Sequence, residues 1–301
     1  MRILVTGVTG QVGGALARRL EGQGIILAAD RGELDLSRPA EISSVLERMA
    51  PDIILNPAAF TAVDAAEDNV DLAMLVNGEA PGAIARWAAA NDVPFIHFST
   101  DYVFNGAGER PWREDDPAGP LSVYGVSKLA GEREIRIAGG CFLIVRTSWV
   151  YAAQGANFLR TIARLARERA ELRIVADQFG APTSATLIAD ILAQIIEGGP
   201  DELRNRIAMA KGHIHLAASG EASWHGFAKA IVEGLRARGA KLAAERIIPI
   251  RTEEYPTKAR RPHNSRLDLA RLQHVFGIIP LHWEAALATE LDAFGNRMET
   301  E

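Results

Sequence analysis

Residues 2–16, RILVTGVTGQVGGAL, give the strongest indication of how this chain folds. An apolar run predicts a β-strand over residues 3–6, and the amphipathic stretch after it predicts a helix over residues 11–23. In that setting, backbone N–H groups and the positive end of the helix can approach a pyrophosphate where no Cβ blocks the way. We therefore expect a dinucleotide-binding turn, with a plain tight turn as the alternative. This turn contains Gly7, Gly10, Gln11, Val12 and Gly13, with the glycines at G-x-x-G-x-x-G spacing.

Short apolar runs alternate with amphipathic stretches through the first half of the chain. The runs at residues 25–30, 53–56, 95–99 and 142–147 are almost continuously apolar, as in parallel strands that are covered on both faces. Amphipathic stretches predict helices at residues 39–49, 71–90 and 122–137. This order predicts an α/β fold with a doubly wound, Rossmann-like parallel sheet.

The second half is less regular. Helical stretches lie at residues 155–170, 185–196 and 224–239, and Ser223 is placed to cap the last of them. Residues 171–176 predict a strand, and residues 213–219 predict a strand that returns to the main sheet. Residues 251–265 are polar and basic without a predicted element, and two short helices follow.

These patterns predict two regions, each built from two separate segments of the chain. The dinucleotide-binding domain takes residues 1–149 and roughly 183–217. A smaller α/β substrate-binding region takes roughly 150–182 and 218–301, and we expect it to cover the ends of the parallel strands.

The composition disfavours several functional classes. The net charge of −5 gives no reason to expect nucleic acid or an anionic membrane as a partner. The single cysteine, Cys141, excludes an internal disulfide, and His213 and His215 have no third ligand at usable spacing, so we expect no metal. No run reaches the roughly 18 apolar residues of a membrane span. The first residues lack the features of a signal peptide, so the expected location is cytoplasmic.

Tyr124 and Lys128 form the most informative pair outside the glycine turn. Four residues apart on a helix, their side chains lie one turn apart on one face. A lysine ammonium near a phenol favours the phenolate and brings the pKa of the tyrosine toward the neutral range. The pair is therefore a candidate general acid/base, with a solvated helix face as the alternative.

Further cofactor contacts are expected where the second and third strands end. Asp30 suits the ribose hydroxyls of NAD, whereas Arg31 next to it suits the 2′-phosphate of NADP, so the sequence leaves NADPH and NADH open. The other candidates are Asp35 and Leu36, which could flank the adenine, and Ala59, Phe60 and Thr61, which follow the third strand.

Together these motifs resemble the extended short-chain dehydrogenase/reductase family. The likeness is closest to reductases of 4-keto nucleotide sugars, and it spans residues 5–268. It rests on TGVTGQVG, AAFTAVDAAE, STDYVFNG, YGVSKLAGE, RTSWVYA, DQFGAPTSA and RRPHNSRLD. Tyr102 follows Asp101 where the sugar-nucleotide dehydratases of the family typically have Glu, so the acid/base pair of dehydration is missing.

The resemblance implies NAD(P)H-dependent reduction of the C4 keto group of dTDP-4-dehydro-L-rhamnose to dTDP-L-rhamnose, the last step of dTDP-rhamnose biosynthesis. It implies that Tyr124 donates the proton and that Lys128 lowers the pKa of Tyr124 and binds the nicotinamide ribose. It also implies that Thr100 bonds the carbonyl oxygen or Tyr124. For the substrate, it implies contacts from Asp101 and Trp149 to the sugar and an anion clamp of Arg261, Asn264 and Ser265 for the diphosphate.

Two alternatives remain open from the sequence. One is a non-catalytic regulatory subunit like that of methionine adenosyltransferase, which the intact Thr100, Tyr124 and Lys128 disfavour. The other is a reductase or epimerase for another nucleotide sugar. Some members of the reductase group dimerise through a magnesium ion held by glutamates, where this chain has Ala15 and Thr186. We therefore expect a monomer or a homodimer that is not bridged by magnesium.

Overall fold

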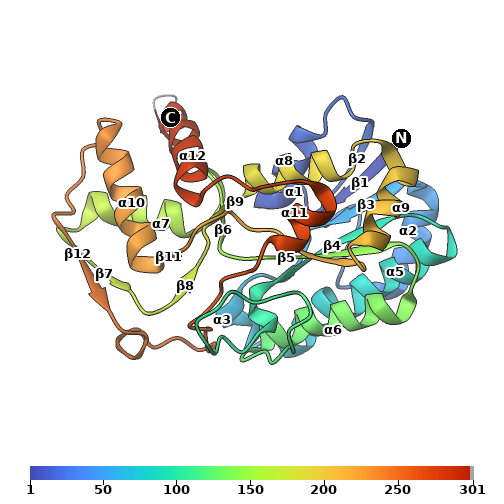
Figure 1. Ribbon diagram of the computed structural model, residues 1–301, viewed down its shortest axis with the longest axis horizontal. Helices are drawn as coiled ribbons and strands as arrows, with labels where there is room; N and C mark the ends of the chain where they lie inside the picture. Colours follow the sequence, from blue (N-terminus) through green and yellow to red (C-terminus); the bar gives the residue numbers. More distant parts are fainter. Residues whose placement is uncertain (299–301) are drawn as a thin grey trace.

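A six-stranded parallel β-sheet forms the centre of the computed structural model, which describes residues 1–298 (Figure 1). The strand order is β10-β5-β4-β3-β1-β2, so the chain winds outward from β1 in both directions. This order confirms the predicted doubly wound, Rossmann-like α/β fold. The strands are β1 Arg2–Thr6, β2 Ile25–Ala29, β3 Ile53–Asn56, β4 Phe95–Thr100, β5 Phe142–Thr147 and β10 His213–His215.

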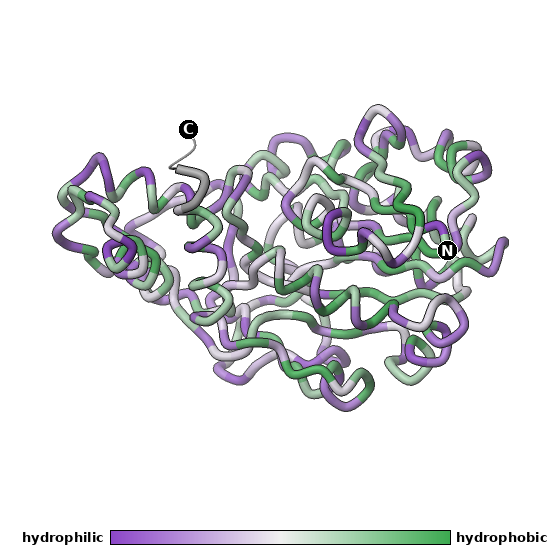
Figure 2. Tube along the Cα trace, turned by 90° about the horizontal axis from the view of Figure 1, so that it is seen from above, coloured by the Kyte–Doolittle hydropathy of each residue, from purple (hydrophilic) through white to green (hydrophobic). Residues whose placement is uncertain are grey.

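Helices cover both faces of the sheet because alternate strand residues point to opposite faces. Ile3 and Val5 of β1 belong to one hydrophobic core, whereas Leu4 belongs to the other. Hydrophobic stretches gather along the interior of these layers, and hydrophilic stretches lie mostly at the periphery (Figure 2). The first core is closed by α1 Gln11–Arg19, α8 Ala185–Ile195 and α9 Gly199–Met209, and the second by α2 Ile42–Met49, α5 Ala80–Ala90 and α6 Val123–Ala138.

The helix predicted over residues 71–90 contains one wide turn. It consists of α4 Val70–Met74, a π-helical turn Leu75–Glu79 and α5, and the short α3 Val63–Ala66 precedes it. The turn lies against α6 so closely that a Cβ on Gly131 would stand 2.2 Å from the backbone oxygen of Asn77. The side chain of Asn77 bonds the backbone N–H and C=O of Phe60, at 2.8 and 3.0 Å. The π-helical turn thereby holds the loop that follows β3.

A smaller group of elements lies beside the carboxyl ends of the sheet strands (Figure 1). Within it, β7 Glu171–Val175 pairs with β12 Arg246–Ile250 in parallel, and α7 Phe158–Glu168 packs against α10 Trp224–Ala237. A short parallel pair, β6 Val150–Tyr151 with β9 Thr183–Ser184, connects this group to the start of α8, and a short antiparallel pair, β8 Phe179–Gly180 with β11 Ala222–Ser223, lies within the group. The chain closes with α11 Ala270–Phe276 and α12 Trp283–Met298.

The sequence predicted most helices and strands correctly, but several of them begin or end at other residues than expected. The first helix stops at Arg19 because a turn follows, in which Gly22 has φ +88°. The last helix is longer than expected, since it extends over 16 residues. The 251–265 stretch contains one helical turn, η4 Thr252–Glu254. Ser223 caps α10 as predicted, with its hydroxyl accepting from the N–H of Gly226 at 3.0 Å.

None of the helices between residues 1 and 298 has the length and apolar character needed to span a membrane.

Candidate active site

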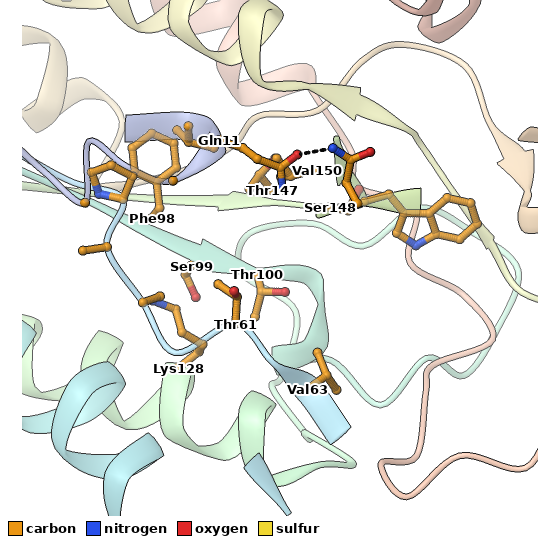
Figure 3. A pocket seen from close by; sticks show the side chains of 18 of the residues that line it. Gln11, Thr61, Val63, Phe98, Ser99, Thr100, Lys128, Thr147, Ser148 and Val150 are labelled. Atoms are coloured by element: carbon orange, nitrogen blue, oxygen red, sulfur yellow. Dashed lines mark hydrogen bonds between the residues drawn. The ribbon is translucent and has the colours of Figure 1, made fainter. Parts of the chain in front are cut away.

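A cavity of about 650 Å³ opens at the carboxyl ends of β1, β3, β4 and β5. It lies where β1 and β3 are neighbours and the winding direction of the sheet reverses, the position at which open α/β sheets bind ligands. Figure 3 shows Thr61, Thr100 and Lys128 toward one side of this space and Gln11, Thr147 and Ser148 toward the other. All five residues of the predicted dinucleotide turn, from Gly7 to Gly13, line it.

Close packing accounts for the glycines of this turn. Gly7 has φ +58°, and a Cβ there would stand 2.9 Å from the Cβ of Ala58 in the loop after β3. A Cβ on Gly13 would stand 2.2 Å from the backbone oxygen of Gly7. A Cβ on Gly10 would meet only that oxygen, at 3.2 Å, so the N-terminus of α1 is open toward the cavity. These features fit a pyrophosphate held by backbone N–H groups at a helix N-terminus.

The predicted acid/base pair lies on the first turns of α6. Ser122 caps the helix by accepting from the N–H of Gly125, at 3.2 Å. Gly125 lets the helix approach the segment after β4, since a Cβ there would stand 2.3 Å from the backbone oxygen of Tyr102. Tyr124 and Lys128 both line the cavity, and Lys128 is 1% exposed. The structure therefore brings this pair together with the dinucleotide turn.

Burial dominates the protonation of the pair. It raises the pKa of Tyr124, and the hydroxyl of Thr100 lowers it by a smaller amount. Burial also lowers the pKa of Lys128 to about 7, while the charge of Glu132 acts in the opposite direction. Tyr124 consequently holds its proton at neutral pH. Burial therefore outweighs the lowering of the Tyr124 pKa that we expected from Lys128.

Thr100 and Asp101 lie where β4 ends. The hydroxyl of Thr100 accepts from the N–H of Tyr102 and donates to Oδ1 of Asp101, at 3.2 and 3.0 Å. Oδ2 of Asp101 is buried without a hydrogen-bond partner. Burial raises the pKa of this carboxyl to about 6, while the side chains of Ser265 and Thr100 act in the opposite direction by smaller amounts. A buried carboxylate oxygen on the cavity wall with no partner is suited to accept a hydrogen bond from a ligand hydroxyl.

An aromatic pair forms the wall on the side of the smaller region. Trp149 has the uncommon φ of +48°, and its indole stacks on Trp224 with ring centroids 3.6 Å apart. A Cβ on Gly180 would stand 2.6 Å from the Trp149 indole. Trp224 was not among the sequence candidates, although its position directly after the capping Ser223 fixes it at the start of α10. Both tryptophans line the cavity.

Gln11 connects the dinucleotide turn to the segment after β6. Its side-chain oxygen accepts from Nδ2 of Asn157 at 3.0 Å (Figure 3). Asn157 also caps α7 and lines the cavity, although no sequence motif singled it out.

Several predicted cofactor contacts lie outside the cavity lining. Asp30 is engaged by the N–H of Gly32, at 2.6 Å. The Arg31 side chain is 79% exposed and pairs with Asp35 at 3.5 Å. Leu36 is a buried core residue, and Phe60 contributes its backbone to Asn77. Asp30, Arg31 and Asp35 lie at the carboxyl end of β2, next to β1, so they border the site along the sheet.

The proposed anion clamp is engaged elsewhere in this structure. Arg261 pairs with Asp64 of α3, with Nη2 2.6 Å from Oδ2. Asn264 is 2% exposed and bonds the backbone oxygen of Arg110 and the side chain of Arg266. Neither lines the cavity, and their role as a clamp stays a prediction.

The two positions that replace metal-binding glutamates have other surroundings. Ala15 is buried, and Thr186 donates its hydroxyl to Glu290 of α12 at 2.6 Å. The other oxygen of Glu290 accepts from the N–H of Ala153 at 2.7 Å. Across residues 1–298, no group of three or more His, Cys, Asp and Glu side chains is arranged to hold a metal ion.

A Rossmann-like sheet, a glycine turn after β1 and a Tyr–Lys pair on one helix define the class of extended short-chain dehydrogenases/reductases. Residues 1–296 match the family model described as RmlD substrate binding domain, and the chain belongs to this family.

Named relatives align over nearly the whole chain. A dTDP-4-dehydrorhamnose reductase of Burkholderia thailandensis is 48% identical over 289 residues, which are 95% of this chain and 97% of that protein. One from Escherichia coli strain K12 is 43% identical and covers 97% of both chains. The crystal structure of dTDP-4-dehydrorhamnose reductase from Bacillus anthracis in complex with NADP has a TM-score of 0.87 and 31% identity, and it covers 97% of this chain and 99% of that one.

Proposed function

We propose that this protein reduces the C4 keto group of dTDP-4-dehydro-L-rhamnose to dTDP-L-rhamnose with NADPH or NADH, as the last step of dTDP-rhamnose biosynthesis. The observation that carries the proposal is the joint placement of Tyr124, Lys128 and the glycine turn on one cavity. The family and the names of the relatives at 48% and 43% identity support the substrate. The cofactor is supported by the NADP complex of the Bacillus anthracis structure.

Tyr124 is the proton donor of the proposed reaction. Burial keeps its phenol protonated, so it holds a proton for the oxygen of the substrate carbonyl. The reduced nicotinamide cofactor, when bound, supplies the hydride. Lys128 lies one helical turn from Tyr124 on the same cavity, and in its ammonium form it stabilises the negative charge that the proton transfer leaves on the phenol. Thr100 orients the carbonyl oxygen when its hydroxyl proton turns from Oδ1 of Asp101 to that oxygen.

Asp101 and Trp149 serve the sugar in this proposal. The unpartnered Oδ2 of Asp101 accepts from a sugar hydroxyl, and the Trp149–Trp224 stack offers an apolar face to the deoxysugar. Arg261, with Asn264 and Ser265, binds the diphosphate after a rearrangement that releases Arg261 from Asp64.

The remaining expectations belong to the same proposal. One is that the dinucleotide-binding domain comprises residues 1–149 and roughly 183–217. Two elements of the second range support it: β10 joins the main sheet, and α8 packs on α1. We also keep the expectation of a monomer or of a dimer without bridging magnesium, and Thr186 supports the absence of the ion because its hydroxyl is bonded to Glu290. A location in the cytoplasm also remains a proposal.

The test is the loss of reduced-nicotinamide absorbance with dTDP-4-dehydro-L-rhamnose, which the upstream dehydratase and epimerase generate in situ. Tyr124→Phe should lower kcat by roughly 100-fold or more, because the proton donor is lost. Tyr255→Phe removes a phenol that is 60% exposed and should leave kcat unchanged. Parallel assays with NADPH and NADH give the cofactor preference. Cofactor binding without turnover, or full activity in Tyr124→Phe, would contradict the proposal.

A further inference from the structure

Lys128 ends in a buried hydrogen-bonded chain that the proposed reaction does not use. Nζ of Lys128 lies 3.1 Å from Nε2 of His97, and Nδ1 of His97 lies 3.0 Å from Nδ2 of Asn56. Oδ1 of Asn56 accepts from the hydroxyl of Thr6 at 2.6 Å, and this hydroxyl accepts from the N–H of Ala58 at 3.2 Å. Asn56 and His97 are fully buried, and Thr6 is 2% exposed.

The chain joins the catalytic helix to both cofactor loops. Thr6 directly precedes Gly7 of the glycine turn, and Ala58 belongs to the loop after β3. Asn56 and His97 are aligned partners on neighbouring strands, β3 and β4. Three side chains, those of Thr6, Asn56 and His97, therefore link both loops to the amine of Lys128.

The hydrogen bonds between Lys128, His97 and Asn56 can be satisfied for both protonation states of Lys128. With a neutral amine, Nε2–H of His97 donates to Nζ, and Nδ1 accepts from the Asn56 amide. With an ammonium, Nε2 accepts and Nδ1–H donates, and the Asn56 amide turns by half a rotation so that its oxygen faces Nδ1 and its N–H donates to the hydroxyl oxygen of Thr6. A neutral imidazole provides one donor and one acceptor in either case. Burial and the charge of Lys128 hold the pKa of His97 well below its usual range, so His97 is neutral.

We propose that His97 is a positioning residue for the reduction: it holds the amine of Lys128 in place at the cavity that Tyr124 also lines, and it is anchored through Asn56 and Thr6 to the two cofactor loops. This inference rests on the proposed function. Since a hydrogen bond to an ammonium is stronger than one to an amine, His97 also favours the charged form of Lys128.

The charged and titratable surroundings of Lys128 are few. His97 faces it from β4, and on α6 Tyr124 and Glu132 are each one turn away. Glu132 is bound by Arg146 and Ser99. Residues 6–10 and 57–61, which form the two cofactor loops, contain no titratable side chain. A substitution at His97 can therefore change the pKa of Lys128 without interference from an ionisable side chain on those loops.

Two substitutions separate the ends of the imidazole. The amide of Gln reaches the place of Nε2, so His97→Gln keeps a partner for Lys128, whereas the amide of Asn reaches the place of Nδ1, so His97→Asn keeps only the partner of Asn56. We expect kcat of His97→Asn at neutral pH to fall roughly tenfold below that of His97→Gln. The alkaline limb of its pH profile should lie about one pH unit lower, because the ammonium has lost an acceptor.

Unfolding provides a readout that needs no turnover. Because the pKa of Lys128 is about 7 in the folded protein and 10.5 in the unfolded chain, the unfolded state binds more protons between these values. Stability should therefore rise with pH over that window, and in His97→Asn the rise should begin at lower pH than in His97→Gln. In a Lys128→Met background, the two variants should have parallel curves.

Identical pH profiles and unfolding curves for the two variants would overturn the inference, as would a pH-dependent difference that persists in Lys128→Met. If the wild type fails to reduce the dTDP-sugar, the proposed function falls, and the unfolding curves still decide whether His97 controls Lys128.

Discussion

Asp101 carries a cost in stability that its place in the site explains. Its Oδ2 is buried without a partner, and burial raises the pKa of the carboxyl from 3.8 to about 6. The folded state thus binds more protons than the unfolded chain between these values, so this group makes stability fall as pH rises from about 4 to 6. The difference corresponds to at most about 3 kcal/mol above pH 6. Functional sites commonly retain such costs.

We therefore expect Asp101→Asn to be more stable than the wild type above pH 6, by up to about 3 kcal/mol, and to lose this advantage near pH 4. Its KM for the dTDP-sugar should rise, since the carboxylate acceptor is lost. Urea unfolding between pH 4 and 8 measures the first effect, and the coupled assay measures the second. A difference in stability that does not vary with pH would show that the carboxyl is not strained in the folded state.

Asp116→Asn is a control with the opposite sign. Hydrogen bonding by Arg110 lowers the pKa of Asp116 to about 2, so its stabilising effect is present above 3.8 and is lost as pH falls toward 2. Its removal should destabilise the protein at neutral pH.

Among the cavity residues outside the glycine turn, Tyr124 and Lys128 were predicted from local spacing, because they are one turn apart on a helix. Thr100, Asp101 and Trp149 were predicted from the family resemblance. His97 and Trp224 were missed because their roles come from partners more than 30 residues away. An apolar strand pattern contains no signal that one buried histidine faces a lysine on a helix.

At the scale of elements, the position of α6 depends on Gly125, which lies between Tyr124 and Lys128 in the sequence. A Cβ on Gly125 would stand 2.3 Å from the backbone oxygen of Tyr102 and 2.9 Å from Cβ of Pro120. In an open helix, Gly→Ala stabilises by about 1 kcal/mol. In Gly125→Ala we expect the clash to reverse the sign, at a cost of about 1–3 kcal/mol.

The same substitution should lower kcat by roughly 100-fold, because the first turn of α6 carries Tyr124 and must move away from β4. Gly295→Ala in α12 is the matched control, since its Cβ meets nothing within 4 Å. It should gain about 1 kcal/mol and keep full activity. Unfolding and steady-state kinetics on both variants measure these effects, and full activity in Gly125→Ala would show that α6 can shift without loss of function.

The sequence predicted which elements exist better than where they end. The buried strands were recognisable because both of their faces are apolar, and β3 and β5 have the expected bounds. The π-helical turn at Leu75–Glu79 follows from packing on α6 and leaves no periodic signal in the sequence. The end of α1 was missed because the turn at Gly22 serves the return to β2.

At the scale of the whole molecule, the cavity is assembled from segments that the sheet brings together. Residues from the ends of four strands face Trp224 of the smaller region across one space. For the dinucleotide-binding domain, the sequence predicted that these segments lie together, because the carboxyl ends of parallel strands share one edge of the sheet. It could not predict the ion pairs of the basic stretch at residues 251–265, in which Lys258 pairs with Asp68 and Arg261 with Asp64.

The Asp64–Arg261 pair joins positions 197 residues apart and competes with the proposed role of Arg261 at the diphosphate. If Arg261 leaves Asp64 when substrate binds, Asp64→Asn removes the competitor. A partly exposed ion pair contributes up to about 1 kcal/mol, so dTDP should then bind up to roughly fivefold more tightly. Asp68→Asn breaks the more exposed pair with Lys258 and should leave the affinity unchanged. Calorimetric titration of dTDP into the cofactor-loaded protein measures both, and weaker binding in Asp64→Asn would show that Asp64 orients Arg261 instead of withholding it.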